Sequence, residues 1–326
     1  MKKKILIIKL GALGDIVHTT IIASAIKQAH PEWQIDFLVS DIHADILKNH
    51  PHIDNVLIWE HSKRKSYKYL ITTAFKLFKN RYDIVFNLTR AFRNNLLTRL
   101  AFPKKIVNKK SFDTNWVEGY FLTAKDIFKE IELPNRLFLG AENSSDKVDN
   151  LLKGITGSIF VIAPGGDTDK NRQGRIWNIE NWKKIAEKIN KELGGTIFVI
   201  GSKREIEKHQ SLKADYLKIT TGDFTISESS YLLSKADFML SGDSGPAHIA
   251  TAHNVKTLTI LGSTTADKIK PFGYNGYSLA SSHFCAGCWK KKCPYLKENE
   301  IYTPCMEAIS VEEVFEKIKE IYSKSS

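Results

Sequence analysis

No apolar run in the sequence reaches the roughly 18 residues that a membrane-spanning helix requires. The basic start, Met1 to Lys4, is followed by only a short apolar stretch before Gly11, less than a secretory signal peptide contains. These two absences argue against a helical membrane protein and against export. We therefore expect a cytoplasmic protein.

Cysteine is absent from the first 284 residues, and all four cysteines lie between positions 285 and 305. A cytoplasmic setting argues against disulfide bonds. The spacing C-x2-C-x4-C-x11-C offers four thiols for a small structural zinc or iron site, although it is irregular for a zinc ribbon. The alternative is that Cys285, Cys288, Cys293 and Cys305 are ordinary small residues.

Acidic residues are scarce in the segment 61–110, where Asp83 is accompanied by fourteen lysines and arginines. The segment carries a charge of +13 in a chain of net charge +12, so the other residues sum to −1. Such a local excess predicts an anionic partner: nucleic acid, an anionic membrane surface or a phosphorylated substrate. The plainer alternative is a solvated lysine-rich face. Nucleic acid is disfavoured because no nucleic-acid-binding module is recognisable.

Aromatic residues interleave with these lysines at Tyr67, Tyr69, Phe75 and Phe78. Helices that lie on a membrane surface have this pattern. Amphipathic helices that turn their aromatic side toward a protein core have it too. The sequence leaves both alternatives open.

The dinucleotide-binding pattern G-x-G-x-x-G is missing from the turn after the first apolar run. That turn, "KLGALGD", carries Gly11 and Gly14 and ends in Asp15, and His18 follows one helical turn later. A carboxylate is a poor neighbour for a phosphate, so a nicotinamide-dependent dehydrogenase is disfavoured. From the residues alone, Asp15 is most simply the N-cap of a helix over 16–29.

Short apolar runs alternate with helical patterns, which is typical of α/β proteins with parallel sheets. The expected strands include Ile5–Leu10, Ile35–Val39, Val56–Trp59, Ile84–Leu88, Ile159–Ile162, Ile197–Ile200 and Thr257–Leu261. The expected helices include 16–29, 67–79, 92–101 and 179–193. A polar stretch near 140–157 interrupts the alternation and is interpreted as a short helix and an interdomain linker.

This pattern predicts two doubly wound α/β domains, residues 1–150 and 158–310, facing each other across a cleft. The last helix, within 311–326, is a candidate for packing back on the first domain. Ligands of such sheets bind at the carboxyl ends of the strands, so the active site is expected there.

The stretch "SGDSGPAHIA", residues 241–250, follows a short apolar strand. Ser244 can cap a helix that begins here, Gly245 lets a ligand approach the backbone, and Pro246 suits the first helical turn. The free N–H groups and the helix dipole favour an anion, and His248 can add a donor. This predicts a diphosphate site; the alternative is a tight turn without a ligand.

A long loop over 163–177, "APGGDTDKNRQGRIW", follows another strand of the same expected sheet. Arg172 and Arg175 lie on it, and an arginine there would neutralise a leaving phosphate. Asp243 stands directly before the predicted diphosphate turn. Because it would repel phosphate, we expect it to accept a backbone N–H or a substrate hydroxyl.

Together, "LGDIVHTT", "PGG…RIWNIENW", "VIGSKRE" and "GDSGPAHIA" resemble glycosyltransferase family 9, the ADP-heptose:lipopolysaccharide heptosyltransferases. The resemblance covers nearly the whole chain in the family's order and spacing. The chain departs from the family pattern at Ile21, where proline is frequent, and at Arg175, where lysine is frequent.

The resemblance implies a GT-B fold and an inverting, metal-independent enzyme that needs no cofactor. It implies transfer of heptose from ADP-heptose to the inner core of lipopolysaccharide or lipooligosaccharide. Asp15 would be the general base, and Gly14 and His18 would lie beside the acceptor sugar. Arg175 and the 243–248 turn would stabilise the departing ADP, and Glu205 would hold the adenosine ribose.

The resemblance also gives the basic segment a role, because the inner-core acceptor carries carboxylates and phosphates on a membrane lipid. Contact with the acceptor, at the cytoplasmic face of the inner membrane, is expected from Lys63, Arg64, Lys65, Arg90 and Arg93. One alternative is a family 9 enzyme with another sugar donor or acceptor. A second alternative is a non-catalytic protein that binds a nucleotide sugar or nucleic acid.

Overall fold

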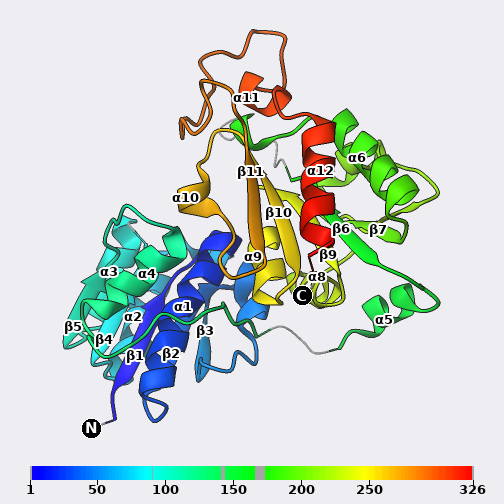
Figure 1. Ribbon diagram of the computed structural model, residues 1–326. Coiled ribbons are helices and arrows are strands. Elements are labelled where there is room, and N and C mark those ends of the chain that lie inside the picture. Colours follow the sequence, from blue (N-terminus) through cyan, green and yellow to red (C-terminus); the bar gives the residue numbers. More distant parts are fainter. Residues whose placement is uncertain (1, 90, 141–143, 166–172, 325–326) are drawn as a thin grey trace. The chain divides into compact units, whose positions relative to one another are not determined.

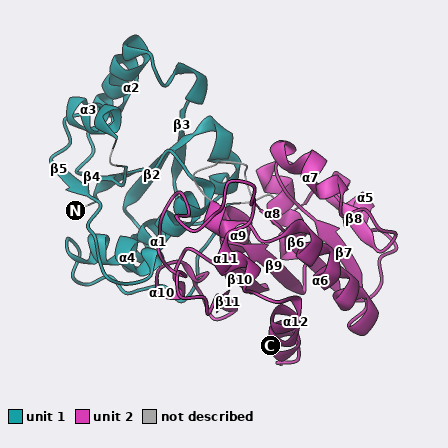
Figure 2. Ribbon diagram, turned by 90° about the horizontal axis from the view of Figure 1, so that it is seen from above, with its two compact units in different colours: residues 1–142 teal, residues 143–326 magenta. Residues whose placement is uncertain are grey.

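The computed structural model describes the chain apart from residues 1, 90, 141–143, 166–172 and 325–326. The chain divides into two compact units, residues 1–142 and 143–326, which Figure 2 shows in different colours. Each unit is built around a parallel sheet that carries helices, as the sequence predicted.

Unit 1 holds a five-stranded parallel sheet in the order β3-β2-β1-β4-β5. Its strands are β1 (Lys4–Ile8), β2 (Gln34–Ser40), β3 (Asn55–Trp59), β4 (Ile84–Asn87) and β5 (Lys105–Asn108). Its helices are α1 (Leu13–Ala29), α2 (Tyr67–Lys79), α3 (Phe92–Leu100) and α4 (Trp116–Lys125), with 3-10 turns η1 (Asp41–Leu47) and η2 (His61–Lys63). The central strand β1 forms because Ile5–Ile8 is apolar on both faces and lies fully buried between helices.

Unit 2 holds a six-stranded parallel sheet in the order β11-β10-β9-β6-β7-β8. Its strands are β6 (Ile159–Ala163), β7 (Thr196–Val199), β8 (Leu217–Ile219), β9 (Phe238–Gly242), β10 (Lys256–Leu261) and β11 (Gly276–Ala280). Its longer helices are α5 (Asp146–Leu152), α6 (Ile179–Glu192), α8 (Ile226–Ser234), α9 (Gly245–Ala252) and α12 (Val311–Tyr322). The short elements are η3 (Gln173–Arg175), η4 (Lys203–Glu205), α7 (Ile206–Gln210), α10 (Ala266–Ile269) and α11 (Pro304–Glu307).

The boundary between the units lies earlier than the sequence indicated, because the short helix expected near 140–157 is present as α5 and packs on α8 in unit 2. The Tyr231 hydroxyl of α8 donates a 2.8 Å hydrogen bond to the carboxylate of Asp149 in α5. Residues from 143 onward therefore belong to unit 2, and the expected boundary near residue 150 is corrected.

The last helix, α12, belongs to unit 2 and packs in its core, and the expected packing on the first domain stays a prediction. Its apolar residues recur every three or four positions and form one stripe. They lie in the core of unit 2, where α12 contacts α6 and β10: Val311, Val314, Phe315, Ile318 and Ile321. Figure 1 shows this helix in red beside α6.

Both sheets reverse their strand order, and this reversal marks where ligands bind in doubly wound folds. In unit 1 the chain runs outward from β1 to β3 and then returns to place β4 on the other side of β1. In unit 2 it runs from β6 to β8 and returns to place β9 beside β6. The ligand sites are therefore expected beyond the carboxyl ends of β1 and β4, and of β6 and β9.

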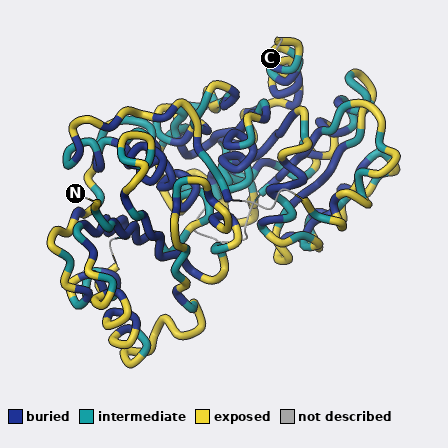
Figure 3. Tube along the Cα trace, turned by 90° about the horizontal axis from the view of Figure 1, so that it is seen from below, coloured by how far each residue is buried: buried dark blue, intermediate teal, exposed yellow. Residues whose placement is uncertain are grey.

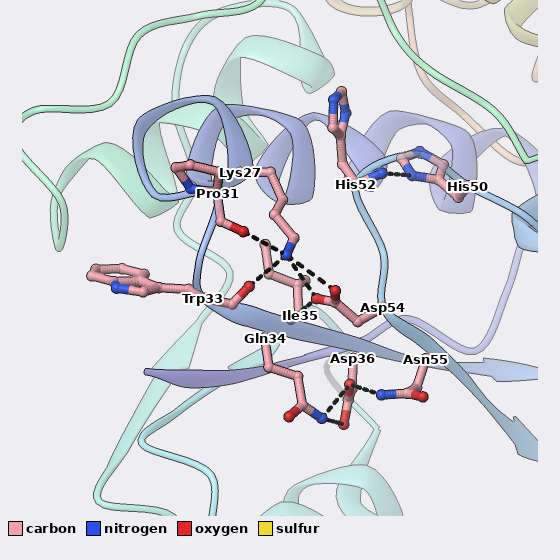
Figure 4. Close-up of polar contacts among 10 residues, drawn as sticks. All are labelled: Lys27, Pro31, Trp33, Gln34, Ile35, Asp36, His50, His52, Asp54 and Asn55. Carbon is pink, nitrogen blue, oxygen red and sulfur yellow. Dashed lines mark hydrogen bonds and ion pairs between the residues drawn. The ribbon is translucent and has the colours of Figure 1, made fainter. Parts of the chain in front are cut away.

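The opposite edge of the first sheet is tied down by a polar network, shown in Figure 4. The Lys27 ammonium of α1 donates to the carbonyl of Trp33 at 2.6 Å and to the carboxylate of Asp54 at 3.1 Å. The same carboxylate accepts the Ile35 N–H at 2.6 Å. This network fixes α1 to the amino ends of β2 and β3, away from the expected ligand edge.

The inner strands of both sheets are largely buried (Figure 3). Among the residues that the structure describes, no helix is both long and apolar enough to cross a membrane.

Candidate functional site

In unit 1, the first expected site residue lies in the first turn of α1, directly after β1. Asp15 is the third residue of a helix that begins at Leu13, so it is not the N-cap, which is Ala12. Its carboxylate accepts a 2.7 Å hydrogen bond from the Lys9 ammonium. Lys9 is almost fully buried, whereas the Asp15 side chain retains 24% of its exposure. The carboxylate is thus held from within the unit and still open to solvent.

Lys9 was not among the expected site residues, although it stands directly before the glycine turn in "KLGALGD". Tyr120 of α4 joins it from a distant part of the chain: the tyrosine hydroxyl lies 3.4 Å from the Lys9 ammonium and 3.1 Å from that of Lys109. Burial, and then the negative charge of Asp15, raise the pKa of Tyr120. Tyr120 therefore stays neutral and hydrogen-bonded beside the carboxylate.

A polar pocket of about 510 Å3 opens beyond the carboxyl ends of β4 and β5. Its lining combines amide and hydroxyl side chains with two cations: Asn87, Thr89, Asn95, Thr98, Arg99, Ile106, Asn108 and Lys109. The buried Asn87 amide donates to Asn95 at 2.6 Å, which holds the lining in place. Since Lys109 also contacts Tyr120, this pocket is linked through one tyrosine to the Lys9–Asp15 pair.

The two other expected residues of the first turn differ in exposure. Gly14 is half-buried within the first turn of α1. His18 is only 4% exposed and points into the unit, so its ring presents little surface to a substrate. Near the same turn, the His43 ring would lie 3.9 Å from a Cβ on Gly11, which makes His43 a further neighbour of the site.

Most of the expected acceptor-binding cations gather around η2 and the start of α3. Lys63, Arg64 and Lys65 are exposed, and Lys63 pairs with Glu60 at 2.7 Å. Arg93 donates a 2.8 Å hydrogen bond to the Arg64 carbonyl, which brings α3 to this cluster. Arg90 lies outside the described residues.

In unit 2, the expected diphosphate turn forms the start of α9, beyond the carboxyl end of β9. Ser244 occupies the N-cap position and Pro246 the first helical turn. The Ser244 hydroxyl does not cap the helix as expected, because it lies 2.8 Å from the Ser241 hydroxyl instead. The hydroxyl therefore takes none of the N–H groups at the start of α9, where the Ala247 N–H donates to the Ser244 carbonyl at 3.3 Å. The positive end of the helix dipole still favours an anion here.

Gly245 begins this helix, and Gly165 shapes the neighbouring strand end. Gly165 has a φ of +62°, a conformation that favours glycine, and a Cβ there would lie 3.8 Å from the Ser244 Cβ. The ends of β6 and β9 thus meet at the reversal point of the second sheet. His248 of α9 is 5% exposed, so its ring lies largely within the unit.

Arg175 and Asp243, which the sequence assigned to separate tasks, form an ion pair at 3.1 Å. Asp243 is 8% exposed and Arg175 is 27% exposed. Asp243 thus has a guanidinium partner that the sequence did not suggest, and its expected contact with a backbone N–H or a substrate hydroxyl stays a prediction. Because a guanidinium has five N–H donors, this pairing leaves others for a phosphate. Arg172 lies outside the described residues.

Glu205 lies beyond the carboxyl end of β7 and is 9% exposed. One carboxylate oxygen accepts both the N–H and the hydroxyl of Ser202, each at 2.7 Å. This carboxylate therefore closes the turn before α7, a structural role that the sequence had not suggested.

The four cysteines differ in their surroundings. Cys285 and Cys305 are buried in the core of unit 2, Cys293 is half-buried and Cys288 is exposed. Burial, and then the proximity of the other three cysteines, raise the pKa of the Cys285 thiol. In the part of the chain that the structure describes, no group of three or more histidine, cysteine or acidic side chains is arranged to hold a metal ion. Two of the four cysteines thus act as small core residues.

Comparisons with known proteins agree with these features. The chain is 26% identical to lipooligosaccharide heptosyltransferase 2 of Campylobacter jejuni (strain 81116) over 328 residues, covering 95% of this chain and 96% of that protein. A family 9 glycosyl transferase from Veillonella parvula superposes with a TM-score of 0.83 at 18% identity, over 99% of this chain and 98% of the other. Escherichia coli heptosyltransferase WaaC, solved with ADP, gives a TM-score of 0.73 at 18% identity over 98% and 99%.

These solved structures are GT-B glycosyltransferases, so the predicted fold class is confirmed. The family profile described as "Glycosyltransferase family 9 (heptosyltransferase)" matches residues 107–298, more than half of the chain. The chain belongs to glycosyltransferase family 9, the heptosyltransferases.

Proposed function

We propose that the protein transfers a heptose from ADP-heptose to the inner core of lipopolysaccharide or lipooligosaccharide, with inversion at the anomeric carbon. The observation that carries this proposal is the division of chemistry between the units. In unit 1 a partly exposed carboxylate, Asp15, follows the carboxyl end of β1. In unit 2 the N-terminus of α9 follows the carboxyl end of β9. A carboxylate base in one unit and a helix N-terminus that favours a diphosphate in the other suit a two-substrate transfer.

Unit 1 would take the acceptor. The pocket beside β4 and β5 offers amides and hydroxyls to a sugar, and Arg99 and Lys109 to its carboxylate or phosphate. Lys63, Arg64, Lys65 and Arg93 would extend this recognition over the surface, and Gly14 and His18 would lie next to the reacting sugar. Lys9 would fix the Asp15 carboxylate in place.

Unit 2 would take the donor. The N–H of Gly245 at the start of α9 and the Arg175 guanidinium would bind the diphosphate, and Glu205 would bind the ribose. Asp243 would hold Arg175 in position. Support for ADP as the nucleotide comes from WaaC, which was solved with ADP and with an ADP-2-deoxy-2-fluoro heptose.

The reaction follows from these roles. Asp15 accepts the proton of the acceptor hydroxyl as its oxygen attacks the anomeric carbon. The bond between that carbon and the diphosphate oxygen breaks, and ADP leaves with the electron pair. The added charge on ADP is stabilised by the helix N-terminus and Arg175, which act without any reorganisation.

We propose that transfer needs no divalent metal and takes place at the cytoplasmic face of the inner membrane. The sequence does contain Asp-Thr-Asp at 167–169, outside the described residues, so the assay includes a chelator. Prompt loss of activity in EDTA, restored by Mg²⁺, would contradict metal independence.

The experiment that tests the proposal incubates the protein with ADP-heptose and a panel of truncated core acceptors. ADP release and product mass are measured together. The expected result is ADP release that depends on one acceptor, which gains the mass of one heptosyl residue. Release from another nucleotide sugar only would identify a different family 9 transferase. ADP-heptose binding without any transfer would indicate the non-catalytic alternative.

A further inference from the structure

Helix α2 exposes a stripe of large apolar side chains. Its buried face packs in the core of unit 1 through Leu70, Ala74 and Leu77. At 100° per residue, a second stripe lies about a quarter turn away from this face. Its members, which are all exposed, are Tyr67, Ile71, Phe75 and Phe78. Of the aromatic residues of this helix, Tyr69 packs against the core beside Trp59, whereas Tyr67, Phe75 and Phe78 are exposed. Each of the two alternatives left open by the sequence therefore fits part of the helix.

This stripe is continuous with the exposed ring of Phe102, which lies in the loop between α3 and β5. The Phe75 and Phe78 ring centroids are 6.5 Å apart, and those of Phe78 and Phe102 are 6.0 Å apart. Phe75 is 54% exposed and Phe102 is 72% exposed. We call Ile71, Phe75, Phe78 and Phe102 the aromatic patch. Contiguous exposed apolar surface of this kind marks an interaction site.

Cations border the aromatic patch. The third face of α2 carries Lys68, Lys76 and Lys79, all exposed, and Arg81 follows the helix. The Lys79 ammonium lies 4.7 Å from the Phe75 ring centroid. The nearest acid in sequence, Asp83, is paired with Lys104 at 2.6 Å. Figure 2 shows α2 beside α3 in unit 1.

We propose that this face of α2 docks on the surface of an anionic phospholipid bilayer. Apolar side chains flanked by lysines match the interfacial region, where rings enter the acyl boundary and ammonium groups contact lipid phosphates. A second copy of the chain would bring an equally cationic face and be repelled. The charge of +13 over residues 61–110 thus complements a lipid surface rather than another copy.

This inference deepens the proposed function and rests on it for its purpose, since docking would bring unit 1 to a membrane-borne acceptor. Lipid binding itself needs no substrate. It can therefore be tested apart from catalysis.

The test is flotation of the full chain with two kinds of vesicle. Neutral vesicles consist of phosphatidylcholine, and anionic vesicles contain about 30% phosphatidylglycerol in phosphatidylcholine. Wild-type protein is expected to float with the anionic vesicles, and at least about tenfold more weakly with the neutral ones. The variant Ile71→Ser/Phe75→Ser/Phe78→Ser should lose about tenfold or more of its affinity for anionic vesicles. The variant Lys68→Gln/Lys76→Gln/Lys79→Gln should lose a similar amount and become less sensitive to salt.

The matched control is Ile301→Ser/Tyr295→Ser, which removes two exposed apolar side chains from unit 2 and should bind vesicles like wild type. Thermal unfolding and transfer to a water-soluble, deacylated acceptor should stay unchanged in every variant. Equal flotation of wild type and the α2 triple serine variant would overturn the proposal. So would a wild-type oligomer that the serine substitutions dissociate, or selective binding of an acidic protein with no vesicle binding. Vesicle binding without transfer to any acceptor would instead refute the proposed function and leave the docking surface standing.

Discussion

Asp15 illustrates how far single residues could be predicted. Its place on a glycine turn was visible, and the family resemblance supplied a role. Its partner, Lys9, was not predicted. Lys9 is held by Tyr120, which lies 111 positions away in the sequence and is brought near by the packing of α1 on α4. In unit 2, the Arg175–Asp243 pair was likewise hidden, since each residue alone suggested a substrate contact.

The Lys9–Asp15 contact gives a residue-scale prediction. Lys9→Met should lower kcat at least about tenfold and leave the KM for ADP-heptose unchanged, because the donor is held by unit 2. Stability should fall by about 1–3 kcal/mol, since a carboxylate loses its partner. Lys9→Arg should recover part of kcat, and Lys2→Met, at an exposed lysine, serves as the control. A rise in donor KM with unchanged kcat would refute the positioning role.

His50 gives a second residue-scale prediction, on pH. Burial, and then the nearby His52, lower the pKa of His50 to about 3, although its hydrogen bond to the Phe138 carbonyl opposes this (Figure 4 shows its contact with His52). The unfolded chain takes up a proton below about pH 6.5, whereas the folded one does not. Above pH 6.5, His50 therefore does not lower the free energy of unfolding. As the pH drops from 6.5 toward 3, His50 lowers this free energy by about 1.4 kcal/mol per pH unit.

Denaturant unfolding at pH 7, 6 and 5 measures this slope. His50→Gln should reduce it by about 1 kcal/mol per unit, and His61→Gln, at an exposed histidine, should not. Identical slopes for wild type and His50→Gln would show that His50 is not the source.

At the scale of elements, helices with a clear apolar stripe were predicted well, as was the edge strand β3, whereas other edge strands were not. The helix over 67–79 is confirmed as α2. The helix expected from 16 begins at Leu13, because the glycine at 14 tolerates a helical turn and α1 needs no side-chain cap. The edge strands β5 and β11 were missed, since one is mostly exposed and the other half-exposed, so neither has an apolar run.

The apolar stripe of α12 predicted that one face of the helix is buried. It could not predict which part of the protein covers that face. Because Phe315 is 1% exposed in the core of unit 2, Phe315→Ala should cost about 3–5 kcal/mol of unfolding free energy. Phe284→Ala, at a 77% exposed ring, should cost less than about 0.5 kcal/mol. Equal effects of the two substitutions would mean that α12 does not complete this core.

For the whole molecule, the alternation of strands and helices was enough to predict two doubly wound sheets. The reversal points follow from the strand order, and both chemical motifs fall on them: "KLGALGD" after β1 and "GDSGPAH" after β9. What the pattern could not give was the polar pocket beside β4 and β5, because its lining converges from three elements and two loops.

The division of substrates between the units predicts how surface charge acts. Replacing Lys63, Arg64 and Lys65 by alanine should raise the KM for the acceptor about tenfold and leave the KM for ADP-heptose unchanged, since exposed charges contribute up to about 1 kcal/mol each. The effect should shrink at high salt. A rise in donor KM alone would reverse the assignment of the two units.

Asp15→Asn, assayed for transfer and for ADP binding in the same preparation, tests the central claim most directly. The substitution keeps the size of the side chain and removes the base, which commonly supplies about 10²–10⁴-fold of rate. The account predicts that transfer falls by at least about 10²-fold while the Kd for ADP stays within about twofold of wild type. Near wild-type turnover, or a loss of ADP binding equal to the loss of transfer, would contradict it.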